Sequence, residues 1–259
     1  MEESRVALVT GGTSGIGLAT ATALAEQGLA VFLCARDGDA VESTVERLRK
    51  EDLEVAGAVC DVRSAAAVAG LTAAVIARYG RIDVLVNSAG RGGGGVTAEL
   101  DEELWDDVIA VNLKGTFLVT RQVLRDGGML DRRWGRVVNI ASTGGKQGVV
   151  LAAPYSASKH GVVGFTKAVG LELAQTGVTV NAVCPGYVET PMAQRVRAGY
   201  AAHWGVTEDD VLRRFEAKIP MGRYAQPEEV AAMVTYLTSD QASVVTAQAL
   251  NVCGGLGNY

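Results

Sequence analysis

Residues 5–17 read RVALVTGGTSGIG, a short apolar run that passes directly into a glycine-rich turn. Gly11 permits a tight turn, while Gly15 and Gly17 let backbone approach a diphosphate and let the next helix pack closely. The N-terminus of that helix offers unpaired N–H groups and the positive end of the helix dipole. Between a first strand and a first helix, this spacing predicts a dinucleotide-binding βαβ unit. The alternative is a turn that is merely tight.

The alternation of strand and helix continues along the chain. The apolar, β-branched segments that we expect to be strands are residues 5–10, 30–35, 55–60, 82–86, 136–141, 178–183 and 247–252. The segments with helical periodicity are residues 16–27, 40–51, 64–79, 101–126, 153–175 and 227–238. Strands that are apolar on both faces are typical of a parallel sheet covered by helices. We therefore predict a single α/β domain over residues 1–259, built on a Rossmann-like, doubly wound parallel sheet of about seven strands.

One segment interrupts this rhythm. Residues 188–222 follow the sixth predicted strand, are polar, and contain Pro191, Gly199, Gly205 and Pro220. Insertions of this length in a compact domain are usually lids or binding elements. We expect a helical lid here.

The composition argues against several classes of protein. With 48% hydrophobic and 20% charged residues, the chain can bury a large core, so we do not expect disorder. A net charge of −5 argues against bulk electrostatic binding to nucleic acid. No apolar stretch approaches the roughly 20 residues that span a bilayer, and the acidic start does not resemble a secretory signal. The four cysteines lack CxxC spacing, and neither histidine lies at a metal-ligand spacing from other potential ligands in the sequence. We therefore expect a cytoplasmic protein with reduced thiols and no metal.

The end of the second predicted strand discriminates between NAD and NADP. A site for NAD usually has Asp or Glu about 20 residues beyond the glycine motif, where it accepts from the ribose 2′-OH. This chain has Ala35 there, followed by Arg36, whose guanidinium can pair with a 2′-phosphate. The sequence therefore favours NADPH/NADP+, although Asp37 could compete as a partner of Arg36. Asp61 and Val62 after the third strand suit the adenine edge, but Asp61 could instead cap the next helix.

A tyrosine and a lysine lie four positions apart in PYSASKH, residues 154–160. Positions i and i+4 share one face of a helix, so Lys159 would bring positive charge close to the Tyr155 phenol. In isolation such a pair would be a solvated surface contact. Here NSAG (residues 87–90) follows the fourth predicted strand and Ser142 follows the fifth. The carboxyl ends of parallel strands meet at one edge, so we expect these groups to converge there.

Together these motifs resemble the short-chain dehydrogenase/reductase family over the whole chain. They are TGxxxGIG at 10–17, NxAG at 87–90, a serine upstream of YxxxK, and Pro185-Gly186 after the sixth strand. The segments NIASTGGKQGV, PYSASKHGVVGFTKA, VNAVCPG and NVCGGLGNY more narrowly resemble the actinorhodin-type ketoreductases of aromatic (type II) polyketide synthases. The resemblance implies NADPH contacts from Thr10, Gly11, Thr13, Ser14, Gly15, Ile16, Gly17, Arg36, Asp61, Val62, Asn87, Ala89, Gly90, Tyr155, Lys159, Pro185, Gly186, Val188 and Thr190.

The resemblance also implies four catalytic roles. Tyr155 would donate a proton to the substrate carbonyl oxygen, and Ser142 would hydrogen-bond that oxygen. Lys159 would hold the nicotinamide ribose and lower the pKa of the phenol from its ordinary value of about 10. Asn112 would anchor a water relay to Lys159, with a helix kink as the alternative role. Ser88 departs from the family's common NNAG form.

The implied substrate is a poly-β-ketone tethered to an acyl carrier protein, of which one carbonyl, typically C9, is reduced. The expected substrate contacts are Arg91, Gly92, Gly93, Gly94, Ser142, Lys146, Gln147, Gly148, Val149, Tyr155 and Met192. Gly92 stands where the actinorhodin-type pattern has proline, which could loosen this loop and leaves the configuration of the product alcohol open. The glycine run could alternatively form plain turns.

Two kinds of partner follow from the same resemblance. Carrier proteins are acidic, so a docking patch should be basic. The candidates, each of which could equally be an ordinary solvated arginine, are Arg91, Arg125, Arg132 and Arg133. A homotetramer is also implied, in which the helices at 101–126 and 153–175 pair between subunits.

Two other functions remain as alternatives. A 3-oxoacyl-[acyl-carrier-protein] reductase of fatty-acid synthesis would use the same residues on a linear chain. A non-catalytic dinucleotide-binding sensor could share the fold, since fold does not dictate function. The intact set of Ser142, Tyr155 and Lys159 argues against the sensor.

Overall fold

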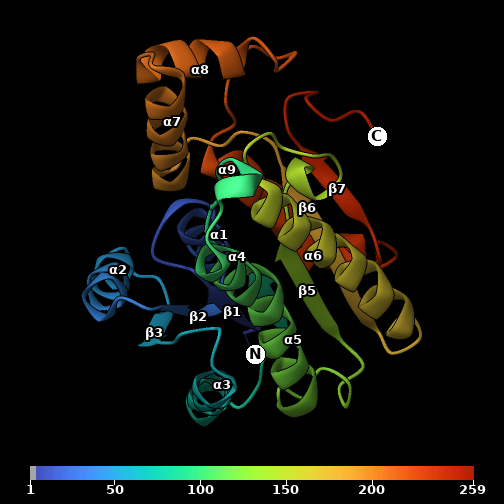
Figure 1. The fold of residues 1–259 in the computed structure, drawn as a ribbon. Helices are drawn as coiled ribbons and strands as arrows, with labels where there is room; N and C mark the ends of the chain where they lie inside the picture. Colours follow the sequence, from blue (N-terminus) through green and yellow to red (C-terminus); the bar gives the residue numbers. More distant parts are fainter. Residues whose placement is uncertain (1–3) are drawn as a thin grey trace.

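Seven strands form one parallel sheet in the order β3-β2-β1-β4-β5-β6-β7 (Figure 1). The structure is a computed structural model that describes residues 4–259. The strands are β1 (Val6–Thr10), β2 (Ala30–Ala35), β3 (Val55–Val59), β4 (Val84–Asn87), β5 (Gly135–Ile140), β6 (Val178–Pro185) and β7 (Ala249–Val252). The doubly wound α/β fold predicted from the sequence is confirmed.

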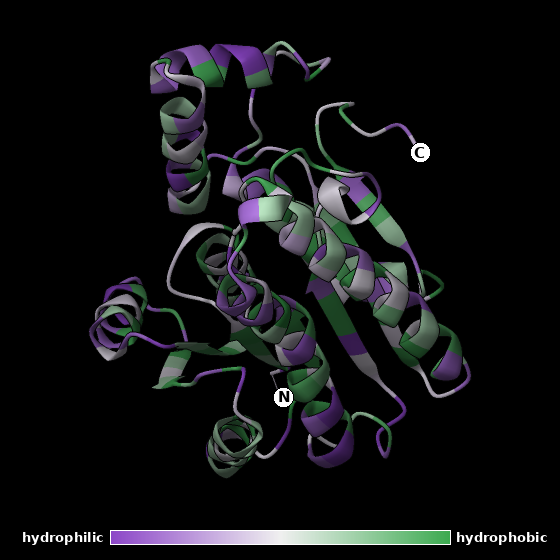
Figure 2. Ribbon diagram, viewed as in Figure 1, coloured by the Kyte–Doolittle hydropathy of each residue, from purple (hydrophilic) through white to green (hydrophobic). Residues whose placement is uncertain are grey.

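Helices cover both faces of this sheet. On one face lie α1 (Gly15–Glu26), α2 (Gly38–Lys50) and α9 (Pro227–Thr238); on the other lie α3 (Ala65–Tyr79), α5 (Gly115–Asp126) and α6 (Ala153–Glu172). Successive strand residues point to opposite faces, so Val6 and Leu8 join one core while Ala7 and Val9 join the other. Figure 2 shows the predominantly hydrophobic strands enclosed between the two helical layers. The apolar runs seen in the sequence are explained by this two-sided burial.

The strand order creates a crevice at the carboxyl edge. β1 lies between β2 and β4, so the direction of winding reverses between β1 and β4. Connections that follow these two strands leave toward opposite faces, which opens a crevice where ligands bind in such sheets.

The helix predicted over residues 101–126 is present from Glu102 to Asp126, but a π-helical turn interrupts its regular α geometry. It consists of α4 (Glu102–Ile109), a π-helical turn (Ala110–Lys114) and α5. A π turn widens the helix by one residue and is frequent at functional sites. The hydrophobic period of the sequence does not distinguish such a turn from regular helix.

The expected helical insertion consists of α7 (Pro191–Trp204) and α8 (Glu208–Glu216), which stand beyond the carboxyl edge in Figure 1. Its helices share a small aromatic core, separate from the two cores of the sheet. The Phe215 ring stacks on Tyr187 at 4.7 Å and meets Tyr200 edge-on at 5.1 Å. The insertion therefore packs largely on itself.

Two features bear on the environment of the chain. Cys34, Cys60, Cys184 and Cys253 are free and buried, as expected. Within residues 4–259, every helix is too short or too polar to cross a bilayer.

A buried carboxylate ties the amino edge of the sheet together. Asp83 is fully buried directly before β4 and accepts a hydrogen bond from the Val6 N–H at 2.9 Å. It also accepts from Arg81 at 2.8 Å and from Arg132 at 3.1 Å. A buried charge with this many donors is held in place by them.

Replacing Asp83 with alanine should therefore lower the free energy of unfolding by about 3–5 kcal/mol, because two partly buried arginines would lose the buried carboxylate that they share. Urea unfolding followed by circular dichroism measures this change. The matched control is Asp131→Ala, which removes an exposed carboxylate at the same edge. Equal losses in the two variants would contradict the role given to Asp83.

Candidate active site

The predicted catalytic side chains meet at the carboxyl edge. Ser142 follows β5, while Tyr155 and Lys159 lie in the first turns of α6. The Lys159 amine is buried and donates to the Ile140 carbonyl, at the end of β5, at 2.7 Å. It also lies 5.8 Å from the centre of the Tyr155 ring. The lysine thus faces into the sheet edge rather than into solvent, which excludes a solvated surface pair.

Burial dominates the titration of this pair. It raises the pKa of Tyr155, although a hydrogen bond with Ser142 acts in the opposite direction. It also lowers the pKa of Lys159 to about 8. For the polypeptide alone, the net shift of the Tyr155 pKa is therefore upward. The apolar surroundings destabilise the charged phenolate, and this effect on the pKa outweighs the hydrogen bond with Ser142.

Asn112 lies in the π-helical turn and joins two parts of the site. Its Oδ1 accepts from the Arg91 N–H at 2.8 Å, and its Nδ2 donates to the Arg91 carbonyl at 3.0 Å. The same Nδ2 donates to Ser158 Oγ at 3.0 Å, and Ser158 donates to the Tyr155 carbonyl at 2.7 Å. Asn112 therefore links the loop after β4 to the catalytic helix, and it also lies within a helix distortion. Ser158 is a further residue of the site that was not predicted from the sequence, and its position three residues after Tyr155 on the same helix was the available signal.

The glycine-rich loop has the shape of a phosphate cradle. Gly11 and Gly15 have φ of +67° and +52°, and a Cβ on Gly17 would lie 2.1 Å from the Gly11 carbonyl oxygen. Gly15 faces Thr190, whose Cγ2 lies 3.1 Å from the position of a Gly15 Cβ. Ser14 precedes α1 without a side-chain cap, so the first N–H groups of this helix remain available to an anion. The residues present therefore fit a dinucleotide pyrophosphate.

The side chains of two predicted cofactor residues connect strand ends instead. Thr10 Oγ1 accepts from the N–H groups of residues 88–89, both at 3.1 Å. Asn87 Nδ2 donates to Thr120 Oγ1 at 2.9 Å and to Asn139 Oδ1 at 2.8 Å. These bonds fix the carboxyl ends of β1, β4 and β5 relative to one another, and they leave the buried Asn87 Oδ1 without a hydrogen-bond partner among the described residues.

Other predicted cofactor residues lie along the same edge. Thr13 and Ile16 flank the start of α1, and Val62 follows β3. A Cβ on Gly90 would lie 3.3 Å from Asn112 Oδ1 and 3.7 Å from the Lys159 amine, so this glycine packs beside both groups. Gly186, after Pro185 of β6, packs against Cys253, and Val188 bridges to Ala225.

The adenine-side residues resolve two alternatives. Asp37 caps α2 by accepting from the N–H of residue 40 at 3.1 Å, so its carboxylate is engaged away from the exposed Arg36. Asp61 does not cap α3, because Ser64 does so. Instead Asp61 accepts from Arg63 Nε at 3.0 Å and NH2 at 2.6 Å. The sequence analysis did not identify Arg63 as part of the site.

The three glycines of residues 92–94 pack against three different elements. A Cβ on Gly92 would make only ordinary contacts, at 3.7 Å to Val196 and 3.9 Å to Met192 of α7. A Cβ on Gly93 would lie 2.6 Å from the Val108 side chain, and one on Gly94 only 1.9 Å from the Leu151 carbonyl oxygen. Gly93 and Gly94 are therefore close-approach glycines rather than plain turn residues.

The residues that follow Ser142 contact two different parts of the molecule. The Lys146 amine donates to the Ala249 carbonyl and to Asn251 Oδ1, both at 2.8 Å, so it holds β7 rather than lining a cleft. The Val149 side chain lies 3.0 Å from the position of a Gly144 Cβ, beside the catalytic serine. Gln147 and Gly148 lie between them.

Three of the four candidate docking arginines lie at the opposite edge of the sheet. Arg125 ends α5, Arg132 contacts Asp83, and Arg133 donates to the Gln175 carbonyl at 3.0 Å. Their use in docking at the site is excluded by this position. Arg91 alone of the four lies at the carboxyl edge.

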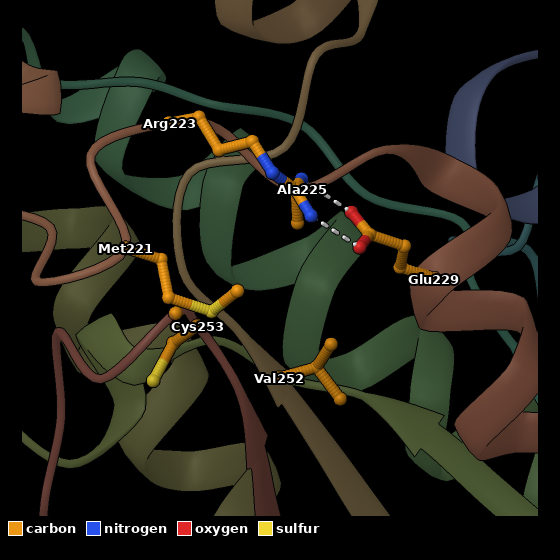
Figure 3. Close-up of a pocket in the computed structure, with 7 residues that line it drawn as sticks. Met221, Arg223, Ala225, Glu229, Val252 and Cys253 are labelled. Atoms are coloured by element: carbon orange, nitrogen blue, oxygen red, sulfur yellow. Dashed lines mark hydrogen bonds and ion pairs between the residues drawn. The ribbon is translucent and has the colours of Figure 1, made fainter.

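A cavity of about 110 Å³ lies beside the site, between the end of the insertion, α9 and β7 (Figure 3). Arg223 and Glu229 border it and form a two-pronged ion pair with N–O distances of 2.8 and 2.7 Å. Met221 and Cys253 line it from the other side. None of the predicted catalytic residues lines this cavity.

Comparison with known proteins agrees with this geometry. A 66% identical relative, which aligns over 99% of this chain and 98% of its own length, is described as a ketoacyl reductase of the monensin polyketide synthase of Streptomyces virginiae. A 62% identical relative from Streptomyces violaceoruber, covering 98% of this chain and 93% of its own, is described as a ketoacyl reductase of the granaticin polyketide synthase. The crystal structure of a variant of actinorhodin polyketide ketoreductase with NADPH superposes with a TM-score of 0.97 at 62% identity, covering 100% of this chain and 99% of that one.

The family follows from a more general comparison. A family model described as short chain dehydrogenase matches residues 5–201, which include the glycine-rich loop, Ser142, Tyr155 and Lys159. The chain therefore belongs to the short-chain dehydrogenase family.

Proposed function

We propose that this chain is an NADPH-dependent ketoreductase that reduces one carbonyl, C9, of a poly-β-ketone tethered to an acyl carrier protein in aromatic polyketide biosynthesis. The observation that carries the proposal is the buried Lys159 amine between the Ile140 carbonyl and the Tyr155 ring. Its similarity to ketoreductases of polyketide synthases over nearly the whole chain supports the substrate class. Four free, buried thiols support a cytoplasmic location.

NADPH fits the residues present. The uncapped N-terminus of α1 and Gly15 opposite Thr190 would hold the pyrophosphate, and Arg36 would pair with the 2′-phosphate. Asp61 would face adenine, and Lys159 would face the nicotinamide ribose. When bound, NADPH supplies the hydride for the carbonyl carbon.

The catalytic residues would manage the charge on the carbonyl oxygen. Ser142 would donate a hydrogen bond to that oxygen, where negative charge develops during reduction. Tyr155 stays protonated because burial raises its pKa, so its proton is ready for transfer to the oxygen. Lys159, charged below its pKa of about 8, would stabilise the phenolate left behind. Asn112 would position the polar groups through which the proton is replaced.

The substrate would lie between the loop at residues 91–94, the segment around Val149, and α7. Tyr200 of α7 donates to the Val150 carbonyl, and Met192 and Val196 face Gly92. The insertion thus reaches the segments on both sides of the proposed substrate space. Whether it admits a cyclised chain or only a linear one separates polyketide reduction from fatty-acid synthesis.

Arg91 is the remaining candidate for docking an acidic carrier protein. Association of copies of the chain, with α4–α5 and α6 paired between subunits, is also part of the proposal. Trp105 and Phe117 support it, because each large apolar side chain is about two-fifths exposed there. Sedimentation would give the number of copies.

Changing Tyr155 to phenylalanine removes the proton donor and should reduce ketone-dependent NADPH consumption by about 10²–10⁴-fold. Consumption is followed by absorbance with trans-1-decalone, a bicyclic ketone, and with an acetoacetyl thioester. The polyketide assignment expects the wild type to prefer decalone, whereas a preference for the linear thioester would favour the fatty-acid reductase. Undiminished activity in Tyr155→Phe would refute the mechanism, and inactivity of the wild type toward all ketones would favour the sensor.

The buried amine of Lys159 should make stability depend on pH. Its folded pKa of about 8 lies below the unfolded value of about 10.4, so folding gains stability as pH rises between these values. Between about pH 7 and pH 9.5, the wild type should gain about 2 kcal/mol relative to Lys159→Met. Urea unfolding of both proteins at the two pH values measures the gain, and a constant difference would show that Lys159 titrates normally.

Residues 92 and 94 provide a matched test of the substrate loop. Gly94→Ala should disrupt the loop, because its Cβ would overlap the Leu151 carbonyl, whereas Gly92→Ala has room. We expect the first variant to lower kcat/KM for decalone at least tenfold and the second to change it less than about threefold, a contrast of at least about 0.7 kcal/mol. Steady-state kinetics measures both, and similar losses would contradict the packing argument.

A further inference from the structure

A chain of four alternating charges crosses the site, and its two middle members have no part in the proposed function. It runs from Asp61 through Arg63 and Asp107 to Arg91. Asp61 and Arg63 follow β3, Asp107 belongs to α4, and Arg91 begins the loop after β4. The charged chain therefore connects the predicted adenine side of the crevice with the predicted substrate side.

Asp107 is the member that both arginines share. Its Oδ1 accepts from Arg63 NH1 at 2.5 Å, and its Oδ2 accepts from Arg91 NH1. Burial acts to raise the pKa of this carboxyl, but the hydrogen bonds from Arg91 and Arg63 outweigh it, and the pKa is lowered. The carboxylate stays charged at neutral pH, and each of its oxygens serves a different arginine.

On the substrate side, Arg91 is held at both ends. Its backbone N–H and carbonyl are bonded to Asn112, and its guanidinium is bonded to Asp107. Asp107 and Asn112 lie on the same helix, on either side of the start of the π turn. Together they set the direction in which the glycines at 92–94 leave Arg91.

The charged chain is open to water at both ends, and the Arg91 side chain on the substrate side is 38% exposed. The side chains of Asp61 and Arg63 are 34% and 39% exposed. Ion pairs this exposed are weak because solvent and salt screen them. A nucleotide lying over Asp61 would exclude water from that end, and the remaining pairs strengthen when the local dielectric falls.

We infer that Asp107 is a positioning residue that couples the adenine side of the crevice to the substrate loop. A bound nucleotide strengthens the ion pair between Asp107 and Arg91, which orders the loop at residues 91–94. Because the loop is ordered before the ketone arrives, the ketone binds more tightly. By reciprocity, the ketone tightens nucleotide binding by the same factor. The inference rests on the proposed function, because it takes NADP(H) and a ketone as the two ligands.

The test is the affinity for NADP+ with and without saturating trans-1-decalone. NADP+ and a ketone cannot react with each other, so titration calorimetry measures binding alone. We expect decalone to tighten NADP+ binding of the wild type about fivefold or more, and of Asp107→Asn less than about twofold. Raising NaCl from about 0.05 M to about 0.5 M should weaken the coupling in the wild type and leave Asp107→Asn unchanged.

The control is Asp106→Asn, which removes the same charge from the adjacent, exposed position of α4 and should keep the coupling. Should thermal melting show that Asp107→Asn is unfolded, Arg63→Lys replaces it, because a single ammonium cannot bridge both carboxylates in the same fork. If folded Asp107→Asn or Arg63→Lys showed the same decalone-induced tightening of NADP+ binding as the wild type, the inference would be overturned. Reduction of decalone by a wild type that shows no coupling would overturn the inference alone, whereas a wild type that neither binds nor reduces would overturn the proposed function with it.

Discussion

The whole site depends on a lysine amine that is buried at the carboxyl edge of a parallel sheet. Burying a charge is costly, and Lys159 offsets that cost by bonding to the Ile140 carbonyl at the end of β5. Gly145 must then remain a glycine, because a Cβ there would lie 2.6 Å from the Lys159 carbonyl oxygen. The phenol of Tyr155 shares this burial, which keeps its proton in place until charge develops on a substrate oxygen.

The scaffold around this amine is rigid where position matters. A buried polar network runs from Asn87 through Asn139 to Thr166 of α6, so β4, β5 and the catalytic helix are tied together behind the site. At the other edge, Asp83 ties β1 and β4 to the segment before β5. The insertion differs, because its aromatic core is formed mainly among its own residues. Rigid elements thus present the chemistry, and a separately packed pair of helices covers it.

Much of the site was accessible from sequence because its signals are local. Three such signals can be recognised within a few positions of the chain. They are a glycine that needs positive φ, a lysine one turn after a tyrosine, and an arginine directly after a strand. The errors concern side chains whose partners are distant in sequence. Lys146 bonds β7 more than 100 residues later, and Arg132 bonds Asp83 49 residues earlier. The Thr10 hydroxyl likewise has distant partners, because it accepts hydrogen bonds from the loop after β4.

By itself, the sequence determined the order of elements, the parallel sheet, the edge at which ligands bind, and the residue types available for proton transfer and phosphate binding. These follow from periodicity, from glycine's conformational freedom and from the winding of βαβ units, which act over short stretches of chain. Only the tertiary structure decided the π turn at Asn112, the raised pKa of Tyr155, and the charged chain centred on Asp107. Each of these three features depends on residues distant in sequence that exclude water from a side chain or share its hydrogen bonds. Only the packing of the folded chain determines which residues these are.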